Sequence, residues 1–286
     1  KQLPEIQAGG VLASLAGRHP VLTLTENRRQ HDLTERTALE QLRSGDVDQA
    51  IGLLRDHGRV VTSTNAESVR DGMVEKWWQH RCSGDDALMM ARRNADVDDL
   101  NRRARRHVAA AGELSGEPLV VNDRPFQIGD QVICTRNDYA NGIRNGTTGT
   151  ITHIDHQRTA VTLSTGDGTR RLDDEYLATG SMRHGYAVTV HKAQGRTCEH
   201  GLLLASDDLH REMGYVGLSR GKQSNRMYLV ADDQPGDELE RHDRQPDQTD
   251  PFALVVDSLR RSAAKRLALD QARTQPDLDD GADIGM

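Results

Sequence analysis

The 286-residue chain carries 37 Lys and Arg against 44 Asp and Glu, and its aromatic content is only 3%. It has no run of about 18 apolar residues and no charged-then-apolar leader pattern, which excludes a membrane-spanning chain and predicts a cytoplasmic one. Cys82, Cys134 and Cys198 form no C-x-x-C pair, so neither a disulfide framework nor a cysteine zinc site is indicated. The chain from Asp232 onward accounts for the whole net charge of −7, so a basic DNA-binding surface elsewhere is not excluded.

The first part of the chain alternates strand and helix patterns. The alternating β-formers of residues 21–25 predict a strand that runs into a polar turn containing arginine. Apolar spacing predicts a helix over residues 33–44, ended by Gly45, and a second over residues 68–80. The run DDALMMA predicts a short buried strand, followed by a helix with Asn94 as its N-cap and Gly112 near its end.

The pattern changes near Gly116. Four short β-runs lie between residues 119 and 179, and Asn-Gly and Gly-Asp-Gly turns separate them. Such close spacing predicts a small antiparallel barrel. Two further strands follow, then a helix from Ser206 to about Gly221, then the strand RMYLVA. This order predicts an α/β layer with the barrel inserted into it.

The last segment is acidic and rich in polar residues. It reads as a linker followed by one amphipathic helix, with Pro251 at its first position and apolar spacing to Leu267.

Polar groups gather between two of the predicted strands, in TVHKAQGRT at residues 189–197. Hydroxyl, ammonium and amide groups beside a glycine indicate a loop that contacts a ligand. Arg29, after the first predicted strand, and Arg220, near the end of a helix, could each hold phosphate oxygens with a planar guanidinium fork. By spacing alone, each is more typical of an ordinary surface arginine than of a catalytic one.

TVHKAQGRT, followed about twenty residues later by YVGLSRGK, resembles motifs V and VI of RecD-like superfamily 1 DNA helicases. The resemblance includes the helicase part of conjugative relaxases of the TraA/TrwC type. NRRQ, at residues 27–30, resembles motif IV, and KQLPEIQAGG at residues 1–10 resembles the tail of motif III. This resemblance implies an α/β fold: a RecA-like second helicase domain, P-loop NTPase-like but lacking the P-loop, with an inserted SH3-like β-barrel.

The resemblance also implies a division of the chain. Residues 1–20 would end the first RecA-like domain, and residues 21–116 and 181–232 would form the second. Residues 117–180 would be the SH3-like insert, and residues 233–286 an acidic linker with a C-terminal helix and tail.

Site residues follow from the same motifs. Gln2 would couple nucleotide state to DNA, Arg29 (or its neighbour Arg28) would contact the terminal phosphate of ATP, and Arg220 would be the arginine finger. The expected cofactors of the intact enzyme are ATP and Mg²⁺. The motif V residues, which would contact the DNA backbone without reading bases, are Thr189, His191, Lys192, Gln194, Gly195 and Thr197.

In the SH3-like insert, Arg136, Arg144 and Asn145 are available to a DNA strand, although a barrel that only braces the helicase fits the sequence as well. The basic run NRRARRH is a further candidate phosphate surface, and also a plain solvated helix face. Trp77 and Trp78 could stack on bases, but at least one is expected in the core.

No G-x-x-x-x-G-K-[ST] phosphate loop occurs, and GLSRGKQ is one residue short of it between the glycines. No apolar strand ends in Asp-Glu. Both observations suggest that the chain begins after the motif II strand, so that in isolation it would bind no cofactor and hydrolyse little or no ATP.

The predicted function is the C-terminal motor portion of an ATP-dependent helicase that translocates on single-stranded DNA in conjugative transfer. Its partners would be single-stranded DNA, the missing N-terminal helicase half and a relaxase domain, if one is present, with no membrane. The alternative is a non-enzymatic DNA-binding or interaction module derived from a helicase. An unrelated barrel protein would require the four-motif order to be accidental.

Overall fold

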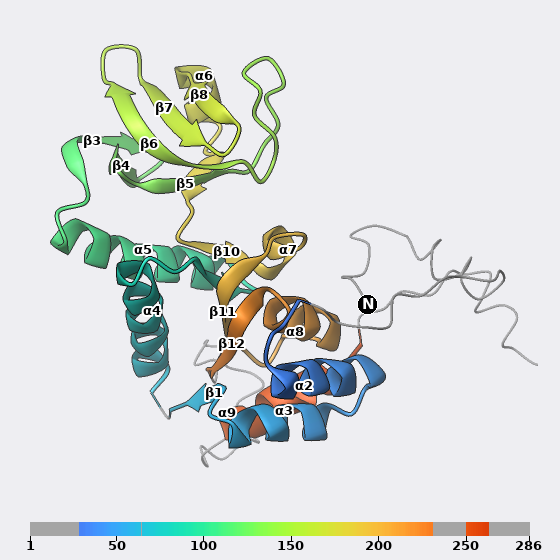
Figure 1. Cartoon of the computed structure of the whole chain (residues 1–286). Helices are drawn as coiled ribbons and strands as arrows, with labels where there is room; N and C mark the ends of the chain where they lie inside the picture. The colour runs from blue at the N-terminus through green and yellow to red at the C-terminus, as the bar shows by residue number, and fades with distance from the viewer. Residues whose placement is uncertain (1–28, 64, 231–249, 263–286) are drawn as a thin grey trace, which may run out of the picture.

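The computed structural model describes residues 29–63, 65–230 and 250–262 (Figure 1). Within these residues, five parallel strands form one sheet in the order β1-β12-β11-β2-β10, as expected for an α/β fold. The strands are β1 (Val60–Thr62), β2 (Ala87–Ala91), β10 (Ala187–Thr189), β11 (Cys198–Ala205) and β12 (Gly221–Leu229). The predicted strand at residues 21–25 lies outside the described residues.

The central strand β11 explains why the sheet forms. It is a nearly continuous apolar run, and all of its residues except Glu199 are buried. It pairs in parallel with β12 on one side and with β2 on the other. A parallel strand covered on both faces needs apolar residues at consecutive positions, which this run supplies.

Helices cover both faces of the sheet. Leu203 and Ala205 of β11 belong to one apolar cluster, which also contains residues of four long helices and of the short helix at residues 190–193. Leu202 and Leu204 belong to the cluster on the opposite face, with two helices. Figure 1 shows the two helix groups on different sides of β11 and β12. The first group is α2 (Leu33–Ser44), α3 (Val47–Asp56), α8 (Arg211–Leu218) and α9 (Pro251–Arg260); the second is α4 (Ala66–Cys82) and α5 (Asn94–Ala110).

Helix ends follow local chemistry where a capping side chain is present. The Asp32 carboxylate accepts hydrogen bonds from the amides of Thr34 and Glu35 and begins α2. Gly45, at φ 108°, ends that helix as predicted, because a left-handed residue there suits glycine. Pro251 begins α9, also as predicted; the expected continuation to Leu267 passes beyond the described residues.

Three predictions about helices are wrong. Arg93 occupies the N-cap of α5, so Asn94 is the first helical residue rather than the cap. The helix predicted from Ser206 begins only after His210, and Gly221 already belongs to β12. Two further elements, helix α3 and the short strand β1, follow α2 and were not predicted from the sequence.

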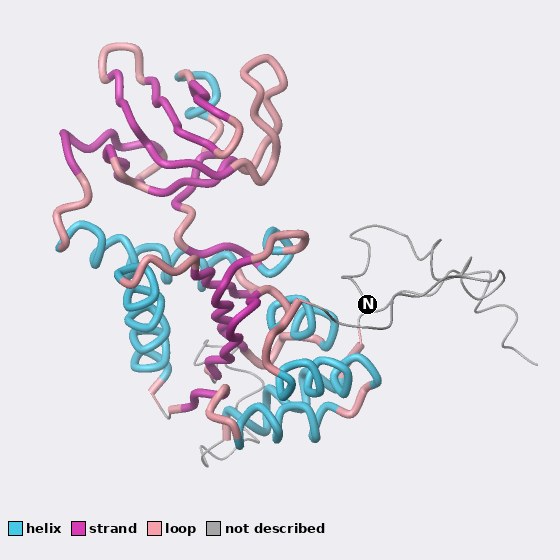
Figure 2. Tube along the Cα trace, viewed as in Figure 1, coloured by secondary structure: helices cyan, strands magenta, loops and turns pink. Residues whose placement is uncertain are grey.

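An antiparallel region is inserted between α5 and β10. Figure 2 shows its strands above the parallel sheet, while the long helices lie with that sheet. Within the described residues, one five-stranded sheet has the order β8-β7-β6-β5-β9, a separate pair is β3-β4, and no ladder joins β8 to β9. The SH3-like barrel and the domain boundaries therefore remain predictions. The elements are β3 (Ser115–Val121), β4 (Arg124–Ile128), β5 (Gln131–Cys134), β6 (Thr148–Asp155), β7 (Ala160–Thr165), β8 (Gly168–Leu172), α6 (Asp174–Ala178) and β9 (Met182–His184).

Candidate functional site

A groove lies at the carboxyl ends of two neighbouring strands. In β10 and β2, which pair in parallel, Thr189 lies beside Ala91, so the residues after each strand emerge at the same edge of the sheet. These are Arg92 after β2, and the four-residue helix α7 (Val190–Ala193) after β10. Ligands of open α/β sheets bind at this kind of edge.

The loop TVHKAQGRT has a defined local structure. Thr189 is the N-cap of α7, and its hydroxyl accepts a hydrogen bond from the Lys192 amide at 3.4 Å. Gln194 ends the helix in an extended conformation, and Gly195 follows at φ 86°. This left-handed conformation favours glycine and turns the chain back toward β11. The predicted contact residues therefore lie on one tight turn.

The groove has a volume of about 670 Å³ and joins this turn to the antiparallel insert. Four predicted residues of the turn line it, together with Asn145 of the insert. The Asn145 amide donates to Asn137 Oδ1 at 2.7 Å, which holds the insert loop in place. The lining contains Thr189, His191, Lys192, Gln194 and Asn145, and also Arg92, Asn94, Thr135, Gly146 and Arg183. Of these, Arg92, Thr135 and Arg183 were not singled out from the sequence.

The charges of the groove are mainly positive, and no Asp or Glu is among its lining residues. Burial, and then the neighbouring Arg183, lower the pKa of Lys192, while Asp98 opposes this shift. Burial, and then the positive charges of His210 and Arg92, lower the pKa of His191. Cations crowded in this way are stabilised by a bound anion, so the groove suits a phosphate backbone.

Two acids offset part of this charge. Arg92 forms an ion pair with Asp208, and Arg183 Nη1 lies 3.8 Å from Asp98. Asp208 also pairs with Arg93 Nε at 2.8 Å, and its own pKa is lowered because hydrogen bonds from Ser206 and Arg93 outweigh its burial. These pairs hold the arginines at the rim of the groove and leave Lys192 as the half-buried cation of the turn.

A second site brings Arg29 and Arg220 together from opposite ends of the described chain. Arg29 Nη1 donates to the Ser219 carbonyl at 3.0 Å, and Arg220 Nη2 donates to the Ser219 hydroxyl at 2.7 Å. Arg220 also donates to the carbonyls of Val216 and Arg196 and is only 7% exposed. Among the described residues, no carboxylate forms an ion pair with Arg220.

The electrostatics of the two arginines favour binding of an anion. Burial, and then the positive charge of Arg29, lower the pKa of Arg220 to about 10. A shift of this size means that the surroundings disfavour the guanidinium cation, and a negatively charged ligand would relieve that cost. The planar forks of two adjacent arginines match the oxygens of a phosphate group.

Buried polar contacts fix the chain on either side of the arginine pair. Gln30 Nε2 donates to the Gly221 carbonyl at 3.0 Å, so the residue after Arg29 is tied to the residue after Arg220. Glu35 accepts from both the backbone amide and the side-chain amide of Asn225, at 2.8 and 2.7 Å. A side chain at Gly221 would place its Cβ 2.2 Å from the Ser224 carbonyl oxygen, so this turn requires glycine.

The other predicted residues lie elsewhere. Arg136 lines a different pocket on the insert, among Asp138, Asp173 and Glu175. Arg144 and Thr197 are exposed and outside the lining of the groove, and Gln2 lies outside the described residues.

The basic run of α5 is mostly engaged in internal ion pairs. Arg103 pairs with Glu67, Asp71 and Asp99, and Arg105 pairs with the buried Asp130. This arrangement favours a structural role for the run. Trp77 is buried against Trp78 and Tyr186, in agreement with the expected place of at least one tryptophan in the core.

One of the missed groove residues carried a signal in the sequence. Arg92 directly follows a buried strand, and the carboxyl ends of parallel strands are where functional side chains gather. Arg183 carried none, because it lies within the short insert strand β9 and reaches the groove only through the packing of the insert.

No helix in the described part of the chain combines the length and the apolar character needed to cross a lipid bilayer.

Comparisons with known proteins agree with these features. A family profile described as an AAA domain matches residues 1–65. The conjugal transfer protein TraA of Rhizobium radiobacter is 28% identical over 231 residues, which is 80% of this chain and 21% of TraA. The RecBCD enzyme subunit RecD of Mycolicibacterium smegmatis is 29% identical over 255 residues, covering 79% of this chain and 43% of RecD.

Among solved structures, Bacteroides Pif1 bound to single-stranded DNA aligns with a TM-score of 0.47 and 15% identity, over 73% of this chain and 52% of Pif1. The chain thus spans about a fifth of the length of TraA and less than half of RecD. The sequence matches to TraA and RecD support a RecD-like superfamily 1 helicase sequence related to TraA.

Proposed function

We propose that this chain supplies the second RecA-like domain, with an SH3-like insert, to an ATP-dependent helicase that translocates on single-stranded DNA during conjugative transfer. The observation that carries the proposal is the convergence of Arg29 and Arg220 on Ser219, although 190 residues separate Arg29 from Ser219. The similarity to TraA, a conjugal transfer protein, supports the biological setting. The location would be the cytoplasm.

The nucleotide would lie against the arginine pair. Arg29 and Arg220 would hold phosphate oxygens of ATP, and the buried contacts of Gln30 and Glu35 would keep both guanidinium groups in place. Gln2 would link this site to the DNA, and Gly195 would let the backbone approach the nucleotide side of the loop. Mg²⁺ and the phosphate loop would come from the other helicase half, because the sequence contains no such loop.

The DNA strand would lie in the groove. Thr189, His191, Lys192 and Gln194 from the turn, with Asn145 from the insert, offer donors to phosphate oxygens. Such contacts position a strand without reading its sequence, as a translocating motor requires. Thr197 and Arg144 lie outside this lining, so we assign them no more than contacts to more distant nucleotides. Arg136 lies outside it among acidic residues, so we assign it no contact to the strand.

A salt series of single-stranded DNA binding tests this proposal. Lys192→Ala should weaken binding of a fluorescent oligonucleotide about fivefold and reduce the slope of log affinity against log salt by about 0.7, as expected for one lost phosphate contact. Arg136→Ala is the matched control, because this exposed cation lies among acids outside the groove. Its affinity and salt slope should equal those of the wild type.

Absence of binding at low salt, or equal losses in both variants, would contradict the assignment of the groove. The alternative function, a DNA-binding module without motor activity, is favoured by the missing phosphate loop. It predicts that DNA binding depends on Lys192 while the full-length protein does not hydrolyse ATP. Measuring DNA-stimulated ATP hydrolysis by the full-length protein separates the two functions.

A further inference from the structure

The hairpin between β5 and β6 carries an exposed aromatic side chain at its tip. The chain has two Trp, five Tyr and two Phe, and all of them lie in the part that the structure describes. Among them only Tyr139 is exposed, with 78% of its surface accessible; the others are buried or partly buried. Single exposed apolar side chains are common on protein surfaces, so the surroundings of Tyr139 decide whether it has a role.

The tip of the hairpin is held in one conformation. Asp138 and Ile143 exchange two backbone hydrogen bonds of 2.8 Å across the hairpin, and the Ile143 side chain is fully buried. The Gly142 amide donates to the Tyr139 carbonyl at 3.3 Å and closes the turn. Arg170 of β8 donates from Nε to the Gly142 carbonyl, also at 3.3 Å. A tyrosine on such a braced turn offers a large contact area at a low cost in conformational entropy.

The base of the same hairpin lines the groove, through Thr135, Asn145 and Gly146. Figure 1 shows the hairpin, drawn in green, rising from the insert above α7. Asn145 is hydrogen-bonded to Asn137, and Tyr139 follows Asn137 by two residues, which span at most about 7 Å. Stacked bases along one strand are about 3.4 Å apart. Tyr139 therefore lies within reach of a base one or two nucleotides beyond the groove.

The charge of the hairpin favours a nucleic acid over an uncharged partner. Between residues 135 and 147 the charged side chains are those of Arg136, Asp138 and Arg144. Asp138 accepts hydrogen bonds from the Asn141 amide at 3.3 Å and from the Asn141 side chain at 2.7 Å, so its oxygens are engaged within the turn. Arg136 lies among acids, whereas Arg144 is exposed on the arm that leads back to the groove. Arg144 would attract the phosphates of a strand that leaves the groove along this arm.

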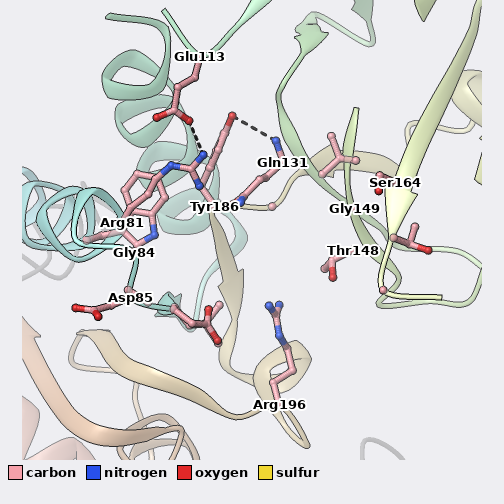
Figure 3. Close-up of a pocket in the computed structure, with 18 residues that line it drawn as sticks. Arg81, Gly84, Asp85, Glu113, Gln131, Thr148, Gly149, Ser164, Tyr186 and Arg196 are labelled. Atoms are coloured by element: carbon pink, nitrogen blue, oxygen red, sulfur yellow. Dashed lines mark hydrogen bonds and ion pairs between the residues drawn. The ribbon is translucent and has the colours of Figure 1, made fainter. Parts of the chain in front are cut away.

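A pocket at the amino ends of β2 and β10 offers a strand a less favourable path. It has a volume of about 550 Å³ and lies between the parallel sheet and strands of the insert. Figure 3 shows Glu113 beside Arg81, and the two side chains form an ion pair of 2.6 Å. More acids than arginines face this pocket, which disfavours a polyanion. The charged residues of its lining are Arg81, Arg196, Asp85, Asp86 and Glu113.

We propose that Tyr139 stacks on a base of single-stranded DNA, one or two nucleotides beyond those whose phosphates lie in the groove. This inference rests on the proposed function, because it takes the groove as the path of the strand. The groove holds phosphates and does not engage bases, whereas every base has a π-face that a tyrosine ring can cover. Tyr139 would thus strengthen the grip on the strand without adding a sequence preference.

Strands with and without bases test the contact. The 286-residue chain is titrated into a fluorescent thymidine oligonucleotide of about 12 nucleotides, a length typical of single-strand binding sites, and into an abasic strand of the same length. Tyr139→Ala should weaken binding of the thymidine strand about tenfold, the cost of one lost base–aromatic stack, and leave binding of the abasic strand unchanged. Tyr139→Phe keeps the ring and should bind both strands as the wild type does. Lys192→Ala should weaken both by the same factor, because it removes a phosphate contact.

Val120→Ala is the matched control, since Val120 is an exposed apolar residue of the insert outside the groove lining, and it should leave both affinities unchanged. Tyr139 is exposed, so Tyr139→Ala should fold and melt at the temperature of the wild type. No loss in Tyr139→Ala, an equal loss on both strands, or an equal loss in Tyr139→Phe overturns the stacking contact. The proposed function still stands in those cases if Lys192→Ala weakens binding. A wild type that binds neither strand overturns the groove and the stacking contact together.

Discussion

The arginine pair and the groove are both positively charged, but they hold their charges in different ways. Arg220 is buried, and its guanidinium donates to the carbonyls of Val216 and Arg196 and to the Ser219 hydroxyl. In the groove, Lys192 is half-buried and the rim arginines share acids. Fixed, desolvated cations suit one anion at one position, whereas a partly solvated set suits a strand that must slide. This difference supports the proposal of one site for a single phosphate group and one surface for many.

The largest effect is expected at the arginine pair. In the full-length protein, Arg220→Ala should lower DNA-stimulated ATP hydrolysis about a thousandfold, because an arginine that stabilises transferred phosphate contributes at least that much. Single-stranded DNA binding without nucleotide should stay within twofold of the wild type. Steady-state hydrolysis and fluorescence anisotropy measure the two quantities.

Arg220→Lys sharpens this test, since it keeps the charge and loses the planar fork. We expect it to restore only a small part of the activity. Full activity in Arg220→Ala would show that the arginine pair is not part of the nucleotide site.

The next largest effect is expected on stability, from a change in the buried contacts beside the arginine pair. Glu35→Ala removes the acceptor for both Asn225 groups and leaves Arg59 without a carboxylate that lies 3.3 Å from it. Loss of one partner in such a buried network should cost about 3 kcal/mol of unfolding free energy. Denaturant unfolding measures this loss, with Glu40→Ala, an exposed change on the same helix, as the control. A cost for Glu35→Ala no larger than that of Glu40→Ala would show that the network does not hold the site.

A smaller effect is expected at the rim of the groove. Arg183→Ala should weaken single-stranded DNA binding about threefold and lower the salt slope by about 0.7, because Asp98 already offsets part of this charge. Arg171→Ala is a matched control: this insert arginine also pairs with one acid, Asp155, but lies outside the groove lining. Equal weakening by both changes would mean that DNA follows the insert rather than the groove.

The smallest effect concerns pH. The pKa of His191 lies below its ordinary value of 6.5, so at pH 7.5 the ring is neutral. As the pH falls through the lowered pKa, the ring gains a positive charge, and DNA affinity should rise about twofold more in the wild type than in His191→Gln. Anisotropy titrations between pH 7.5 and 5 compare the two proteins. The same pH response in both would show that His191 does not contact the strand.

Much of this protein could be predicted from the order of its residues. The apolar runs of β2 and β11 predicted strands, Gly45 and Pro251 marked helix ends, and the turn glycines marked the antiparallel insert. Local patterns determine such features because propensity and capping act over a few residues. The helix α6, which Asp173 caps, and the short strand β1 were not predicted, because each is too short to show a hydrophobic period.

Relations between distant residues were decided by the tertiary structure. Sequence motifs singled out Arg29, Arg220 and the turn at Thr189. Ser219 is the sequence neighbour of Arg220, but only the hydrogen bonds of Gln30 and His31 to the start of β12 bring Arg29 to it. The same holds for Arg183 in the groove, and for His80 and His200, which lie 120 residues apart and meet because β11 pairs with β2. Sheet order and strand register set these encounters, and no local pattern encodes them, because they depend on which strands lie side by side.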